Sequence, residues 1–231
     1  MSEPKATLPP EEREQLAALC ESRSATYGFL ARLYQREVDA DYLKLMRGMR
    51  FPASTGNMDV DDGHRMIVAY LSSVWENSVE ELAIDYSRTF IGSGVDAYSA
   101  AYPNESVYTS ERRLLMQEAR DEVRVIYRSM GLKKLDSYAE NDDHIAVELE
   151  FMKEICSRAA EALRAGDEIQ AIKMITVQKN FHEDHLANWV PMMTADMRLL
   201  AKTGLYQGLA RLTDGFLEVE GAFLEEILCE G

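Results

Sequence analysis

The scarcity of proline beyond the N-terminus constrains this chain more than any other sequence feature. Of six prolines in 231 residues, only Pro52, Pro103 and Pro191 lie after residue 10. The stretches between them repeatedly place apolar residues three and four positions apart, which is the spacing of an amphipathic helix. We therefore predict an all-α fold: a flexible segment over residues 1–10, then a single-domain bundle of about ten helices over residues 11–231.

Several expected helix boundaries carry local signals. Pro10 followed by Glu11 and Glu12 is typical of a first helical turn. A helix is expected to resume near Thr109 and to end before Gly131, which suits a left-handed position. The other expected caps are Ser78 with Glu81 in a capping box, Asp142 or Asp143 before a helix that ends at Gly166, and Asp167 before the next helix.

The start of one expected helix has an ambiguous pattern. Ile145, Val147, Leu149 and Phe151 alternate with Ala146, Glu148 and Glu150, as in a half-buried strand. The apolar spacing continues through Met152, Cys156 and Leu163 over about 22 residues, which is far longer than a typical strand. We predict a helix here.

The longest irregular segment inside the chain runs from Ile91 to Asn104. It contains Gly92, Gly94 and Pro103 and shows no helical period. Loops of this length inside compact domains are often functional. We expect a functional loop near residues 91–108.

Charge and cysteine content restrict the partners and the compartment. The 25 Lys and Arg against 40 Asp and Glu give a net charge of −15, which disfavours nucleic acid and anionic membrane surfaces and favours a cationic partner. The three cysteines are far apart and lack zinc-ligand spacing. No stretch is apolar enough for stable membrane insertion, and the N-terminus has no export signal. We expect a cytoplasmic protein.

The sequence offers little support for catalysis. His144 with Glu148 and His182 with His185 have helical spacings, so a metal-dependent helical enzyme is the leading alternative function. They lack the Glu-x-x-His pairs of di-iron bundles, and no nucleophile motif or phosphate loop occurs. A ligand-binding module of a regulator is a third alternative, although no basic DNA-contacting helix is evident. We predict no enzymatic activity and no cofactor.

Two segments combine acidic, aromatic or imidazole, and apolar side chains within a few residues. They are Tyr98–Tyr108 and Asn141–Met152. This mixture suits a groove that binds a peptide carrying both cations and an apolar run. Alternatively, these side chains only hold a long loop in place.

The same segments resemble the motifs of the TorD and DmsD family of redox-enzyme maturation chaperones, to which NarJ-type proteins are related. The resemblance covers most of the chain in order, with departures at Thr89, Ser93, Tyr102 and Asn104. The matching residues are Tyr86, Phe90, Gly92 and Gly94; Pro103, Glu105, Ser106, Val107 and Tyr108; Asp143, His144, Ile145, Glu148, Leu149, Phe151 and Met152; and Phe181, His185, Leu186 and Trp189.

The resemblance implies an all-helical cytoplasmic chaperone, in some cases a domain-swapped homodimer. Such a chaperone binds the twin-arginine signal peptide of the catalytic subunit of a molybdopterin oxidoreductase and holds the precursor until its cofactor is inserted. The physical interpretation agrees, because two guanidinium groups followed by an apolar stretch complement an acidic protein with an aromatic groove.

The expected signal-peptide site draws on both segments. We place Asp143, His144 and Glu148 at one rim, Glu105 and Tyr108 across the groove, and Phe90 as an apolar wall, with Tyr86 and Trp189 completing the site. Glu148 is alternatively a buried acid that orients the loop. If His144 lies at this rim, its protonation would weaken peptide binding as the pH falls from about 8 to 6.

Overall fold

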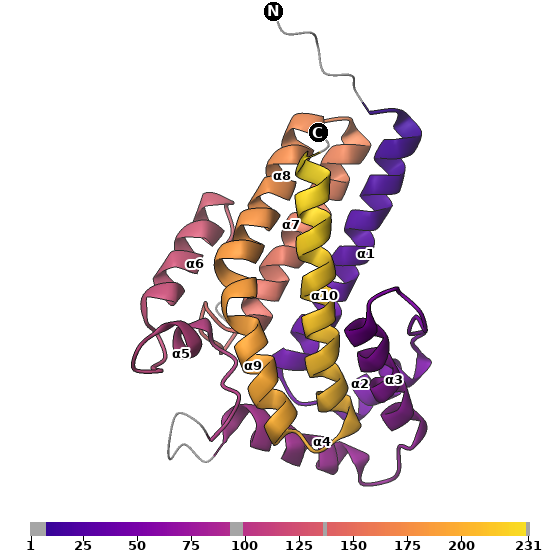
Figure 1. The fold of residues 1–231 in the computed structure, drawn as a ribbon, viewed down its shortest axis with the longest axis vertical. Coiled ribbons are helices and arrows are strands. Elements are labelled where there is room, and N and C mark those ends of the chain that lie inside the picture. The colour runs from indigo at the N-terminus through magenta and orange to yellow at the C-terminus, as the bar shows by residue number, and fades with distance from the viewer. Residues whose placement is uncertain (1–7, 93–98, 136–137, 230–231) are drawn as a thin grey trace, which may run out of the picture.

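The computed structural model describes residues 8–92, 99–135 and 138–229 and shows an all-α protein (Figure 1). In these residues the only paired extended backbone is an isolated bridge between Asn104 and His144. The predicted fold class is confirmed. The helices are α1 (Pro10–Gln35), α2 (Ala40–Gly48), α3 (Met58–Ser72), α4 (Ser78–Tyr86), the π-helical η1 (Ser87–Ile91), α5 (Glu105–Thr109), α6 (Glu118–Ser129), α7 (Ile145–Ala165), α8 (Glu168–Phe181), the π-helical η2 (His182–Leu186), α9 (Ala187–Leu200) and α10 (Gly204–Cys229).

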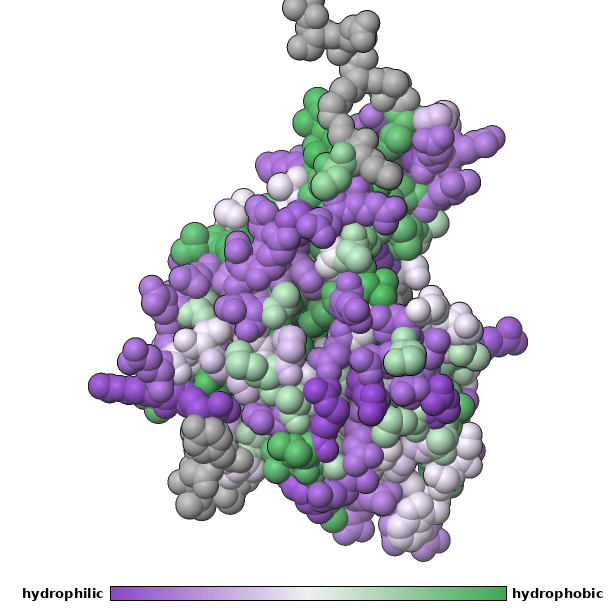
Figure 2. All heavy atoms as spheres, viewed as in Figure 1, coloured by the Kyte–Doolittle hydropathy of each residue, from purple (hydrophilic) through white to green (hydrophobic). Residues whose placement is uncertain are grey.

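The long helices α1, α7, α8 and α10 run side by side along the long axis of the molecule (Figure 1). α1 packs chiefly on α7, and α3 packs on α10. Their apolar faces meet in a core that includes Tyr27, Leu149 and Trp189, each without accessible surface. No helix among the described residues is long and apolar enough to span a bilayer. The face drawn in Figure 2 is largely hydrophilic, with apolar side chains in scattered groups.

The ambiguous segment 145–151 is helical, as predicted, and forms the first turns of α7. Its apparent two-residue period arises because this end of the helix is buried on every side. The intervening Ala146 and Glu148 are as inaccessible as Ile145 and Leu149. Burial on all faces removes the polar stripe by which an amphipathic helix is normally detected.

Four of the expected boundaries are confirmed. α1 begins at Pro10 with Glu11 and Glu12 in its first turn, and α7 ends before Gly166, whose φ is +74°. Gly131 follows the last turn of α6 with a φ of +70°, and the Asp167 side chain accepts a hydrogen bond from the Gln170 N–H at 3.0 Å. Two others are wrong. His144, not Asp142 or Asp143, caps α7, and Asn77 precedes α4, so that the Ser78 hydroxyl accepts from the Trp75 N–H instead of forming a capping box.

The expected helix near Thr109 is interrupted. α5 ends at Thr109 and α6 begins only at Glu118. Between them, Arg113 and Met116 have positive φ values of 51° and 60°, which is uncommon for residues other than glycine. The Arg113 guanidinium lies 4.9 Å from the centre of the Tyr108 ring and 3.5 Å from the Asp196 carboxylate, so tertiary contacts hold this turn.

Glycine allows the close approach of α3 to α10. A Cβ atom on Gly208 would lie 2.8 Å from the Gly63 carbonyl oxygen, and a Cβ on Gly63 would lie 2.6 Å from the Leu212 nitrogen. No larger side chain fits at either position without moving backbone. This contact fixes the small helices α2 and α3 against the long bundle.

Candidate functional site

The segment Tyr102–Ser110 separates two hollows in the protein surface. On one side lies a groove of about 630 Å³, here called the aromatic groove, lined by Gln35, Arg36, Glu37, Asp39, Tyr86, Phe90, Ile91, Tyr102, Pro103, Asn104, Glu140 and His144. On the other side lies a more polar hollow of about 460 Å³ that includes Glu105, Glu111, Glu118, Glu122 and Asp184. The predicted functional loop therefore forms a wall between two cavities.

Aromatic rings line the aromatic groove where α4 passes into η1. The Tyr86 and Phe90 rings lie 4.9 Å apart, and the Tyr86 hydroxyl donates to the Tyr34 carbonyl at 2.8 Å. The π-helical turn follows directly after Tyr86, and such turns are frequent at functional sites. Tyr102, from the loop wall, adds a third ring to the lining.

The rim of the aromatic groove is acidic. Asp39 is partly neutralised, because Arg32 lies 3.3 Å and Arg36 4.0 Å from its carboxylate. In the described part of the chain, no Lys or Arg forms a salt bridge with the carboxylate of Glu37 or Glu140. Among the described residues, the groove therefore offers two carboxylates without a Lys or Arg partner next to aromatic and apolar surface.

Asp143 stabilises the loop wall by hydrogen bonds to its backbone. Its carboxylate accepts from the Ser106 N–H at 3.0 Å, and its backbone carbonyl accepts from the Glu105 N–H at 2.9 Å. These bonds satisfy the first donors of α5, where a carboxylate is electrostatically favoured. Asp143 is fully buried, so it acts as a cap supplied by a distant segment.

His144 is the N-cap of α7 and lines the aromatic groove. Its Nδ1 accepts from the Ala146 N–H at 3.1 Å, so this nitrogen is unprotonated, and its Nε2 lies 3.7 Å from the Glu140 carboxylate. Burial, with a smaller contribution from the charge of Lys134, lowers the pKa of His144 to about 3. The expected titration of His144 between pH 8 and 6 is therefore wrong: the ring is neutral throughout that range.

Glu105 pairs with His185 beneath the loop. The His185 Nδ1 lies 2.9 and 3.2 Å from the two Glu105 carboxylate oxygens, and both side chains are buried. Glu105 begins α5, and His185 lies in the π-helical η2. The pair therefore ties the loop wall to the line of helices formed by α8 and α9.

Glu148 completes the buried network. Its Oε2 accepts from the Trp189 Nε1–H at 3.1 Å, while its Oε1 accepts no hydrogen bond. Burial, followed by the charges of Glu105 and Asp143, raises the pKa of Glu148 well above its usual value. Its surroundings thus favour the protonated form of Glu148. Above it, the Tyr108 ring stacks on Trp189 with centroids 5.7 Å apart.

The structure divides the predicted site residues into two groups. Tyr86, Phe90 and His144 line the aromatic groove. Asp143, Glu148, Glu105, Trp189 and Tyr108 form a network beneath the loop wall, and all but Tyr108 are buried. The predicted accessible rim of Asp143, His144 and Glu148 is wrong in its geometry, because all three side chains are buried. Their part in peptide binding stays a prediction. Gly94 and Tyr98 lie outside the described residues.

Three residues of the alternative metal site have separate partners, and the fourth, His182, is buried with an Nδ1 that has no hydrogen-bond partner among the described residues. His144 caps a helix, His185 contacts Glu105, and Glu148 accepts from Trp189. Within the described ranges, no group of three or more His, Cys, Asp or Glu side chains is placed to hold a metal ion.

Sequence reasoning missed the acidic rim of the aromatic groove. Glu140 belongs to the acidic run Glu140–Asp143 that precedes α7, and this run was a usable signal. Glu37 and Asp39 lie about a hundred positions earlier, between α1 and α2, where nothing local marks them. Tyr102, noted only as a departure from the family motif, contributes an aromatic ring to the groove.

Comparisons with known proteins agree with the sequence motifs. Residues 57–195 match the family model described as the nitrate reductase delta subunit. The chain is 25% identical over 217 residues to the chaperone protein TorD of Photobacterium profundum, covering 91% of this chain and 98% of that protein. It is 24% identical over 223 residues to TorD of Vibrio cholerae, covering 94% and 98%, and 26% identical over 222 residues to TorD of Shewanella pealeana, covering 89% and 91%.

Proposed function

This chain belongs to the nitrate reductase delta subunit family, and we propose that it is a cytoplasmic chaperone that binds the twin-arginine signal peptide of a molybdopterin oxidoreductase. The relatives described above are named chaperones, and the alignments with them cover nearly their whole length. The chain is not an enzyme. It holds the precursor of its client while the cofactor is inserted.

The observation that carries the proposal is the composition of the aromatic groove. Glu37 and Glu140 lack a Lys or Arg partner among the described residues, and Tyr86, Phe90 and Tyr102 lie beside them. A guanidinium group forms paired hydrogen bonds with a carboxylate and stacks on aromatic faces. Two carboxylates without a described Lys or Arg partner, together with three rings, therefore match the chemistry of two neighbouring arginines.

The buried network supports the groove indirectly. Asp143 fixes the start of α5, and the Glu105–His185 and Glu148–Trp189 pairs hold the same wall from behind. We assign these residues the role of positioning Tyr102–Asn104, which line the groove. This is the second of the two roles considered for Glu148 from sequence.

The experiment that tests the proposal removes charge from the groove rim. In the Glu37→Gln/Glu140→Gln double variant, a synthetic twin-arginine signal peptide should bind at least about tenfold more weakly by calorimetry, because a charge-assisted hydrogen bond contributes roughly 1.5–3 kcal/mol. The matched control is Glu161→Gln/Glu226→Gln, which changes the net charge equally at two exposed sites.

The control separates local recognition from general attraction. If both double variants lose affinity equally, the protein attracts the peptide only through its net charge of −15 and the groove is not the site. If the wild-type protein does not bind the peptide at all, the proposed function is wrong.

A further inference from the structure

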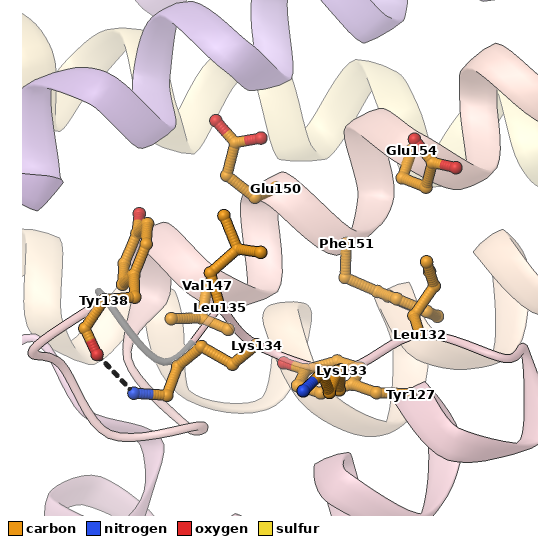
Figure 3. A pocket seen from close by; sticks show the side chains of 10 residues that line it. All are labelled: Tyr127, Leu132, Lys133, Lys134, Leu135, Tyr138, Val147, Glu150, Phe151 and Glu154. Atoms are coloured by element: carbon orange, nitrogen blue, oxygen red, sulfur yellow. Dashed lines mark hydrogen bonds between the residues drawn. The ribbon is translucent and has the colours of Figure 1, made fainter.

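A third hollow lies next to the aromatic groove, on the other side of the segment 138–144. It has a volume of about 360 Å³ and is here called the apolar hollow. Figure 3 shows Val147, Glu150, Phe151 and Glu154 projecting from α7, with Leu132, Lys133, Lys134, Leu135 and Tyr138 on the other side. Tyr127 of α6 completes the lining, which consists of Tyr127, Leu132, Lys133, Lys134, Leu135, Tyr138, Val147, Glu150, Phe151 and Glu154.

The acidic side chains around the apolar hollow already have partners. The Lys153 Nζ lies 2.9 Å from the Glu150 carboxylate, and the Arg158 Nε lies 2.8 Å from that of Glu154. The Lys134 ammonium donates to the Tyr138 carbonyl at 2.6 Å and to the Glu140 carbonyl. Because the rim carboxylates of this hollow are paired with basic side chains, the hollow favours an uncharged, apolar occupant. In the aromatic groove, by contrast, Glu37 and Glu140 have no Lys or Arg partner among the described residues.

The aliphatic side chains of the apolar hollow are accessible to a binding partner. The Leu135 side chain is 67% exposed, and Leu132 is only partly buried against the core. When an apolar partner covers a large aliphatic side chain at the mouth of a cavity, binding is stabilised because apolar surface is removed from water.

One short segment connects the two cavities. Tyr138 lines the apolar hollow, and Glu140, two residues later, lines the aromatic groove. The bonds from Lys134 to both of their carbonyls fix the distance between them. The start of α7 also borders both cavities. Its N-cap His144 lines the aromatic groove, and Val147 in its first turn lines the apolar hollow. A single extended peptide that leaves the groove across this segment meets the apolar hollow next.

We propose that the apolar hollow receives the apolar run that follows the two arginines of the signal peptide. The arginines then lie at Glu37 and Glu140, and the chain direction of the peptide runs from the aromatic groove over Tyr138 to Leu132, Leu135 and Phe151. This inference rests on the proposed function. It makes Leu132 and Leu135 specificity-determining residues, selecting peptides by the length and apolarity of the run.

The first test combines a protein variant with a peptide variant. Leu135→Asp should weaken binding of the full peptide by about tenfold or more, the loss expected when one large aliphatic side chain is no longer covered. It should leave unchanged the affinity for a peptide that keeps both arginines but has serine and glycine in place of the apolar run. The matched control is Ile169→Asp on α8, a side chain 85% exposed and remote from both cavities, which should change neither affinity.

The outcomes distinguish this inference from the function on which it rests. If Leu135→Asp weakens both peptides equally, or neither, the apolar run binds elsewhere and the inference is overturned, while the proposed function stands. If the wild-type protein binds neither peptide, the proposed function itself fails. Near-ultraviolet circular dichroism of each variant checks that the fold is intact.

A second test locates the peptide directly. A benzophenone placed in the middle of the apolar run should crosslink to residues 132–138 or 147–151, and one placed beside the arginines should crosslink to residues 86–91 or 102–104. Crosslinking of both probes to the same cavity, or of the apolar probe to the polar hollow, contradicts the assignment.

Discussion

The Nε1–H of Trp189 donates to Oε2 of Glu148 over 3.1 Å, and neither side chain has any accessible surface. The acid in the middle of the family motif is therefore bonded inside the protein, where burial and the charges of Glu105 and Asp143 raise its pKa. Because Tyr108 stacks on the same indole, this bond connects α7 to the loop that walls the aromatic groove. Its removal should affect both stability and binding.

Replacement of Glu148 tests the neutral state directly. Glu148→Gln keeps an oxygen that accepts from Trp189 and an N–H in place of the acid proton, so it should fold and bind peptide like the wild type. Glu148→Ala leaves the indole N–H without a partner and opens a cavity, which should lower the free energy of unfolding by about 2–4 kcal/mol in urea titrations.

The pH dependence of the Glu148→Gln variant has a defined sign. A carboxyl whose pKa is raised in the folded protein binds more protons there than in the unfolded chain, so its contribution to stability is lost as the pH rises. The variant should therefore gain stability relative to the wild type between pH 5 and 8. A constant difference across that range would mean that Glu148 is ionised in the fold.

His144 should act in the opposite direction. Its folded pKa of about 3 lies below its unfolded value, so the unfolded chain takes up the proton first and stability falls as the pH drops through about 6 toward 4. Asn is also a good N-cap, so His144→Asn should keep α7 but lose up to about 1.4 kcal/mol of this dependence per pH unit.

Burial also lowers the pKa values of His64 and His182, which contribute with the same sign, so the informative quantity is the difference between wild type and variant. Equal slopes of stability against pH for the two proteins would show that His144 is accessible to protons. The change in peptide affinity between pH 8 and pH 6 should be the same for His144→Asn as for the wild-type protein.

The glycine contact between α3 and α10 predicts a steric effect. Gly208→Ala brings a methyl group within 2.8 Å of the Gly63 carbonyl oxygen and should cost about 1–3 kcal/mol of stability. Gly48→Ala serves as the control, because no atom lies within 4 Å of the added Cβ and alanine favours the helical state of α2. Equal melting temperatures for the two variants would contradict the close packing of these helices.

A buried ion pair joins α1 to α10. The Arg23 guanidinium donates to both Glu220 oxygens at 2.7–3.0 Å, and its positive charge also lies 4.5 Å from the Phe223 ring centre. Arg23→Ala leaves Glu220 charged and unpaired inside the bundle and should destabilise the protein by about 3–5 kcal/mol. Arg65→Ala, which breaks an exposed pair with Asp62, should not change the chemical denaturation midpoint detectably. A similar result for both would argue that water reaches Glu220.

The fold was predictable because helical periodicity survives wherever one face meets solvent. Helical periodicity failed as a guide between Thr109 and Glu118, where Arg113 and Met116 are left-handed and Arg113 contacts Tyr108 and Asp196. At residues 145–151 the pattern was ambiguous because Ala146 and Glu148 are buried together with their apolar neighbours.

The site was only partly predictable for a similar reason. The motifs located the correct segments, but charge in a sequence carries no information about depth, and carboxylates are exposed in most proteins. Asp143, Glu105 and Glu148 depart from that rule because each has a hydrogen-bond partner on a distant helix or loop. Glu37 reaches the groove only through the packing of α1 against α7, which no local pattern indicates.

The central claim is that the aromatic groove recognises arginine specifically, and one comparison tests it most directly. The affinity of the wild-type protein should be measured by calorimetry for a twin-arginine signal peptide and for the same peptide with both arginines replaced by lysine. The account predicts weaker binding of the lysine peptide by about 1–3 kcal/mol, because an ammonium group cannot form the paired bonds of a guanidinium. Equal affinity for the two peptides at physiological salt would contradict it.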